Sequence, residues 1–207
     1  MAGDLPNHST RANLTIAMQF DSPFSSASLR EMKSEFERIM RPAGPSIEWR
    51  MLNDVANNEV FHEIVVVRFR GSCQTGGSKA DPWDSRYLAM TREEGGEVLP
   101  FSEIDCRQLL GMLSLNPLKE AGSTFSLQRL LGRAMGRVLA HEVYHAVVRT
   151  ASHSGRGIAK SAFTPVDLFE AGMRFERAQV EQFNAALCRV TSISGSLISA
   201  AKLPGFE

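Results

Sequence analysis

Hydrophobic and polar residues recur at regular intervals along most of this chain, and the intervals predict its secondary structure. Alternation typical of strands occurs at 13–20, and a run of β-branched residues predicts a second strong strand at 61–69. Spacings of three and four residues, typical of amphipathic helices, mark 25–40 and 126–150. The full predicted series is strand 13–20, helix 25–40, strands 47–51, 61–69, 86–91 and 97–101, and helices 103–113, 126–150 and 165–190.

Segments rich in glycine, proline and serine separate these elements, such as 42–45 after the first helix and the long loop 71–85. The order of strands and helices predicts the α+β class, with a mixed twisted sheet packed on helices. We expect one domain over 1–207. In it, 11–150 form the sheet and the long helix, and 151–207 form a small helical C-terminal lobe.

The charges of the chain balance, because 23 basic and 23 acidic residues give no net charge. This balance removes a whole-chain attraction to nucleic acid or anionic membranes. No segment approaches the roughly 18 apolar residues of a membrane span, and the first residues do not follow the pattern of a signal peptide. We therefore expect no nucleic acid and no membrane as partners. The predicted location is the cytoplasm, or outside it if the chain is the mature form of a secreted protein.

The cysteine content adds one structural expectation. At 207 residues, of which 43% are apolar, the chain can bury a core without relying on disulfides. Three cysteines are too few for a disulfide scaffold or a cysteine-rich zinc motif. They allow one bridge, for which Cys73 and Cys106 are the favoured pair.

The predicted helix at 126–150 contains the sequence His141-Glu142-Val143-Tyr144-His145. Residues four apart lie on the same side of a helix, so His141 and His145 can bind one metal ion together. Two histidines at this spacing, with a glutamate after the first, favour a metal centre over core histidines that only form hydrogen bonds. Glu142 is the candidate general base for a metal-bound water.

The two sides of this helix differ in polarity. Its apolar stripe runs through Leu127, Leu131, Ala134, Val138, both histidines and Val148. The arginines of the other side and its flanks are Arg129, Arg133 and Arg137. We expect the stripe to face the core and the arginines to face solvent.

A catalytic zinc ion usually has three protein ligands and leaves its fourth position to water. His153 is the nearest candidate for the third ligand, because the small and polar residues around it can turn the chain back toward the helix. The alternative is a glutamate of the last predicted helix. Glu170 is the best placed of these, ahead of Glu176 and Glu181.

The block from Leu131 to Lys160, which contains both the HExxH sequence and His153, resembles the metzincin clan of zinc metallopeptidases. It is more similar to a bacterial group of metzincin-like proteins with a lengthened gap before the third histidine. The resemblance implies a zincin-like fold and a Zn²⁺ ion held by His141, His145 and His153. It also implies a cleft in which the edge strand at 86–91 pairs with an extended peptide or protein substrate.

Two features depart from the pattern of the clan. The third histidine comes eight residues after His145 instead of six, and Val148 stands where the clan has a glycine. The clan also has a methionine in a turn beneath the metal, whereas 157–159 could occupy that place here with Ala159. No tyrosine follows His145 to stabilise a transition state.

The residues and the resemblance together predict a zinc metallopeptidase that hydrolyses peptide bonds through a zinc-bound water, with Glu142 as the general base. Two alternatives stay open. One is a non-catalytic zinc-binding protein that keeps the fold as a partner-binding module. The other is a gluzincin-type peptidase with Glu170 as the third ligand. The sequence predicts neither the substrate nor the oligomeric state.

Overall fold

A computed structural model describes residues 13–75, 87–114, 124–170, 172–192 and 198–199. A five-stranded sheet in the order β2-β1-β4-β6-β5 forms its centre. The strands are β1 (Asn13–Phe20), β2 (Ser46–Met51), β4 (Glu63–Arg70), β5 (Ala89–Glu94) and β6 (Glu97–Asp105). The pairs from β2 to β6 are parallel, whereas β5 runs antiparallel to β6 and forms one edge of the sheet.

The helices are α1 (Ser26–Met40), α2 (Cys106–Ser114), α3 (Thr124–Val148), α4 (Pro165–Phe169) and α5 (Arg177–Ser192). Shorter elements are η1 (Arg41–Ala43), η2 (Leu52–Asp54) and the pair β3 (Val60–Phe61) and β7 (Ile198–Ser199). In the described part of the chain, none of the helices has the length and apolar character that crossing a membrane requires.

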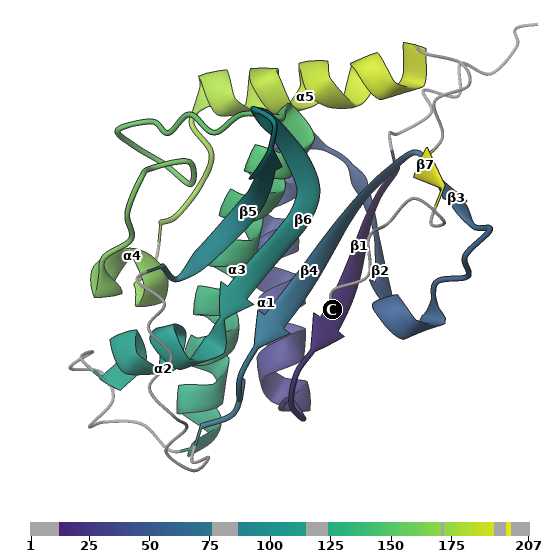
Figure 1. The fold of residues 1–207 in the computed structure, drawn as a ribbon. Coiled ribbons are helices and arrows are strands. Elements are labelled where there is room, and N and C mark those ends of the chain that lie inside the picture. Colours follow the sequence, from purple (N-terminus) through teal and green to yellow (C-terminus); the bar gives the residue numbers. More distant parts are fainter. Residues whose placement is uncertain (1–12, 76–86, 115–123, 171, 193–197, 200–207) are drawn as a thin grey trace, which may run out of the picture.

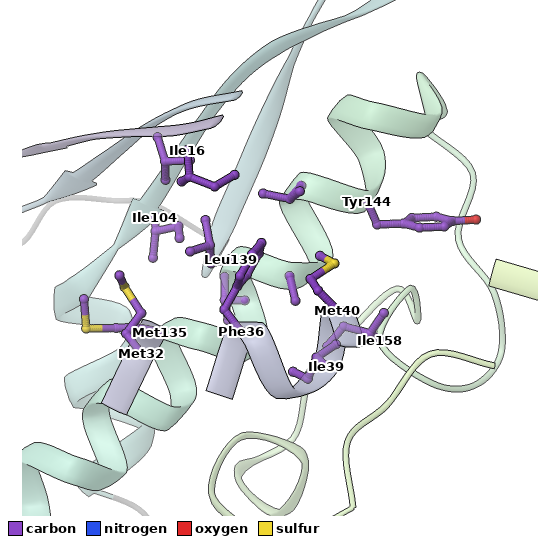
Figure 2. Packing of buried hydrophobic residues seen from close by; sticks show 14 of the residues in the cluster. Ile16, Met32, Phe36, Ile39, Met40, Ile104, Met135, Leu139, Tyr144 and Ile158 are labelled. Atoms are coloured by element: carbon purple, nitrogen blue, oxygen red, sulfur yellow. The ribbon is translucent and has the colours of Figure 1, made fainter. Parts of the chain in front are cut away.

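The main core lies between the sheet and the helices α1 and α3, which cover the same face (Figure 1). Figure 2 shows Ile16 and Ile104 of the sheet facing Phe36 of α1 and Leu139 of α3. A smaller apolar cluster, which includes Ile64, lies on the opposite face of the sheet. The central strand β4 is therefore buried on both faces, as strands in the interior of a parallel sheet usually are.

Helix α3 approaches α1 closely because glycines occupy two successive turns of the contact. A Cβ atom at Gly132 would lie 2.4 Å from the carbonyl oxygen of Ser28, and one at Gly136 would lie 2.6 Å from that of Met32. The Ser28 hydroxyl also donates a hydrogen bond to the Gln128 carbonyl oxygen, at 2.9 Å. These contacts fix the position of the histidine-bearing helix relative to α1.

We expected Arg137 to face solvent, and this prediction is wrong, because the residue is only 2% exposed. Helix α1 covers this side of α3, and Arg137 Nε donates to Glu35 Oε1 at 2.6 Å. Burial alone would raise the pKa of Glu35, but its hydrogen bonds from Arg38 and Arg137 hold that pKa below its ordinary value. Arg129 and Arg133 lie nearer the surface and pair with Glu31.

Two predicted helix boundaries also differ from the structure. Strand β6 continues to Asp105, so α2 begins at Cys106 instead of 103. The Asp105 carboxylate accepts hydrogen bonds from the N–H groups of Arg107 and Gln108 and thereby caps α2. The last predicted helix is divided into α4 and α5, because the backbone becomes extended at Glu170 and has a positive φ at Gly172.

The expected disulfide between Cys73 and Cys106 is present. It links the segment after β4 to the first residue of α2, and both cysteines are fully buried. The predicted edge strand at 86–91 is also found, as β5, but it begins at Ala89 and residue 86 lies outside the described residues.

Gly136→Ala should destabilise the protein, because the new methyl group would meet the backbone of α1. Such overpacking lowers the free energy of unfolding by about 1–3 kcal/mol. The higher helix propensity of alanine, about 1 kcal/mol, offsets part of this loss. Gly111 is the matched control, since it lies inside α2 with open space around its Cα. Urea unfolding should show a loss for Gly136→Ala and no loss for Gly111→Ala. Equal stability of the two variants would contradict the close contact of α1 and α3.

Candidate metal centre and cleft

A cavity of about 640 Å³ lies between the edge strand β5 and helix α3. Its walls come from β5 and the residues before it, from α2, from α3 and from the segment after α3. The residues used below are Leu88, Thr91, Glu93, Met112, Val138, His141, Glu142, His145, His153, Lys160 and Phe163. The predicted helix residues and the predicted edge strand therefore line one common space.

His141 and His145 lie on the cavity side of α3, and they are 7% and 5% exposed. His141 Nδ1 lies 2.7 Å from the carbonyl oxygen of Ile158, and His145 Nδ1 lies 2.6 Å from that of Thr150. A carbonyl oxygen can only accept a hydrogen bond, so each Nδ1 carries the proton. In the neutral rings, both Nε2 atoms then present lone pairs, and these atoms lie 3.0 Å apart.

Two lone pairs at this distance repel each other unless a cation lies between them. Zinc–nitrogen bonds of about 2.0–2.1 Å in a tetrahedral site separate two ligand nitrogens by roughly 3.3 Å, close to the separation found here. Burial lowers the pKa of His141 to about 4 and also lowers that of His145. Both rings are thus neutral at pH 7, the state in which histidine binds a metal. The donor set therefore fits a divalent transition metal.

His153 lies close to His141 and His145, although the side chain of His153 is exposed. Its ring centroid is 5.3 Å from that of His141 and 4.7 Å from that of His145. One ligand atom from each of the three histidines lies within 4.8 Å of the others. The structure thus brings together the three residues that the sequence proposed as metal ligands.

The backbone after α3 explains how His153 returns to the helix despite its longer spacing. Arg149 has a positive φ of 57°, the left-handed conformation that commonly ends helices. The N–H of Thr150 then bonds to the carbonyl oxygen of His145 at 3.2 Å. The turn follows directly after Val148, so no glycine is needed at that position. Farther on, the N–H of Ser154, the residue after His153, bonds to the carbonyl oxygen of Ala159.

The segment 157–159, which we considered for the place of the clan's methionine turn, contacts His141. Ile158 is fully buried and supplies the carbonyl oxygen that accepts the hydrogen bond of His141. Its own N–H bonds to the carbonyl oxygen of Arg174 at 3.0 Å. The contact with His141 is therefore made by the backbone of Ile158 and does not depend on a methionine side chain.

Glu142 is buried beside the histidines and bonds to the edge strand. Thr91 Oγ1 donates to Glu142 Oε2 at 2.6 Å. The hydroxyl groups of Thr91 and Ser102 are 2.9 Å apart, so Ser102 must donate to Thr91 while Thr91 donates to Glu142. Burial raises the pKa of Glu142 to about 7, and the hydrogen bond from Thr91 opposes that increase.

The sequence interpretation missed Thr91, Ser102 and the carbonyl groups of Thr150 and Ile158. A threonine in a strand or a backbone carbonyl in a loop has no local signature. Thr91 and Glu142 are 51 residues apart, and only the packing of β5 over α3 brings them together. Alternation along the strand could have placed Thr91 and Glu93 on one face, but not opposite a particular residue.

Glu170, the alternative third ligand, lies at the C-terminal end of α4 and is exposed. Glu176 is also exposed, and Glu181 pairs with Arg177 on α5. Among the described residues, the group that could hold a metal consists of the three histidines and includes no glutamate.

Comparison with known proteins identifies the fold. No protein-family model matches the sequence, and no curated protein matches it. The structure is similar to that of an archaemetzincin from Methanopyrus kandleri, with a TM-score of 0.53 and 11% sequence identity over 89% of this chain and 100% of that one. The predicted fold class is thereby confirmed: an α+β fold with a twisted, mostly parallel sheet packed on helices, similar to that of the archaemetzincin.

His153→Ala should weaken zinc binding by at least about 100-fold, because loss of a direct ligand should cost no less than loss of an outer hydrogen-bond partner. Competition with a chromophoric chelator measures the affinity, and His62→Ala is the control because His62 is exposed and lies outside the cluster. Glu170→Ala should also keep the parent affinity. Loss of zinc in Glu170→Ala together with its retention in His153→Ala would instead support the glutamate alternative.

Proposed function

We propose that this chain is a zinc metallopeptidase whose Zn²⁺ ion is held by His141, His145 and His153. The observation that carries the proposal is the pair of converging Nε2 atoms, which the carbonyls of Ile158 and Thr150 hold with their lone pairs facing each other. Such outer hydrogen bonds usually orient metal-binding histidines. The archaemetzincin-like fold also supports the proposal.

Bound zinc would supply a Lewis acid that polarises the peptide carbonyl and makes water a better nucleophile near neutral pH. Glu142 is the general base in this proposal. Its Oε2 atom is held by Thr91, which fixes the plane of the carboxylate and leaves Oε1 to take a proton from the attacking water. The same carboxyl then gives the proton to the leaving amine. A pKa raised to about 7 suits a group that both accepts and donates a proton at neutral pH.

The edge strand β5 is the proposed binding site for the peptide substrate. Strand β6 occupies one side of β5, and the other side is the edge of the sheet. An extended peptide can add to such an edge through main-chain hydrogen bonds. Because the same strand lines the cavity and holds Glu142, a peptide bound there would pass the metal ligands and the base.

Glu142→Gln tests the catalytic part of this proposal. The amide keeps the shape of the side chain but cannot accept the proton, so kcat/KM should fall at least about 100-fold. Zinc content should stay at that of the parent, because Glu142 is not a proposed ligand. Glu170→Gln is the matched control, since it removes an exposed carboxylate outside the histidine cluster and should change neither quantity.

Two results would contradict the proposal in different ways. Cleavage by zinc-loaded Glu142→Gln at the parent rate would exclude Glu142 as the base. A zinc-loaded parent protein that cleaves no member of a broad peptide library would support the non-catalytic, partner-binding alternative.

A further inference from the structure

The cavity has an uneven distribution of charge. Among its described lining residues, the charged side chains other than the histidines and the buried Glu142 are Glu93 and Lys160. Most of the other lining residues are apolar or small, such as Leu88, Met112 and Val138. A ligand in this cavity therefore meets few charges, and their positions determine which charged ligands it can accept.

The two charges lie near different histidines. Glu93 is exposed near the end of β5, and its negative charge acts on His145, where it raises the pKa against the larger effect of burial. Lys160 Nζ lies 6.0 Å from the ring centroid of Phe163. That ring in turn packs edge-on against His141, with 5.2 Å between the centroids.

The two charges also differ in whether the protein already neutralises them. Lys160 forms an ion pair with Asp167, so much of its charge is compensated within the fold. Glu93 forms no ion pair within the described residues. No described side chain pairs with the Glu93 carboxylate, so it can form a direct ion pair with a cationic group of a ligand.

The direction of β5 indicates where along a bound peptide this charge would act. Thr91 bonds to Glu142, and Glu93 lies two residues farther toward the end of the strand. A peptide that adds antiparallel to β5 places its N-terminal part beside the end of that strand. Glu93 would then face residues on the N-terminal side of the cleaved bond, whereas Leu88 and Met112 would face the C-terminal side.

We propose that Glu93 forms a cation-selective subsite, so that the substrates are peptides with a positive charge just before the cleaved bond. The charge can come from a lysine or arginine side chain or from a free α-amine, which share the ammonium or guanidinium chemistry that a carboxylate recognises. This inference rests on the proposed peptidase function. It adds a substrate class and a residue that determines specificity.

Peptide binding to the zinc-loaded Glu142→Gln protein tests the subsite without any turnover. The probes are fluorescent peptides of one length and one apolar background. One has a central lysine and an acetylated N-terminus, and a second replaces that lysine with glutamine. A third has glutamine and a free N-terminus, and a fourth has glutamate and an acetylated N-terminus. Comparison of the lysine and free-amine probes distinguishes the two sources of positive charge.

Fluorescence anisotropy at low salt should show that at least one cationic probe binds about fivefold more tightly than the acetylated glutamine probe, as expected for one partly exposed ion pair. In the Glu142→Gln protein, a second substitution Glu93→Gln should remove this difference in affinity. With Glu93→Lys as the second substitution, the glutamate probe should bind most tightly instead. Glu94→Gln is the matched control, because Glu94 is the next residue of β5, is exposed and does not line the cavity. It should leave the preference unchanged.

The outcomes separate this inference from the proposed function. No preference for the cationic probes, or a preference that persists in Glu93→Gln, would overturn the subsite whether or not the parent protein cleaves peptides. A Glu93-dependent preference in a parent protein that cleaves no peptide would support the subsite and contradict the peptidase function.

Discussion

The candidate metal centre depends on two hydrogen bonds from histidine side chains to backbone carbonyls. The carbonyl oxygens of Ile158 and Thr150 fix both the ring orientation and the proton position of His141 and His145. Without these contacts, the HExxH spacing would bring two rings to one side of a helix but would not direct both Nε2 atoms to one point. Both carbonyls belong to the segment that also carries His153. The three histidines and the carbonyls that orient two of them therefore come from one helix and the chain that leaves it.

The rest of the fold holds this helix and this segment in place. Gly132 and Gly136 allow α3 to lie directly against α1. The buried Arg137 binds Glu35 of α1 and also donates to the carbonyl oxygen of Asp167 in α4, at 2.6 Å. Breaking such a buried pair by removing one partner typically costs about 3–5 kcal/mol. The scaffold thus joins α1, α3 and α4 through one buried side chain.

Much of this architecture could be predicted from the sequence, because it follows from local periodicity. The first strand and helix, the long helix and the histidine cluster were all found where the pattern indicated. The burial of Arg137 could not be predicted, since it depends on a glutamate about a hundred residues earlier. The division of the last helix and the contact of Thr91 with Glu142 are likewise set by tertiary packing. Sequence patterns indicated the three clustered histidines but not the residues that orient them.

X-ray absorption spectroscopy at the zinc edge of the zinc-loaded chain tests the central claim most directly. Three histidine ligands predict scattering from three imidazole nitrogens at about 2.0–2.1 Å, with one further light atom from solvent. The pattern should be the same in the parent protein and in Glu142→Gln. A spectrum that shows two imidazoles and a protein carboxylate, or a protein that binds no zinc, would contradict the account.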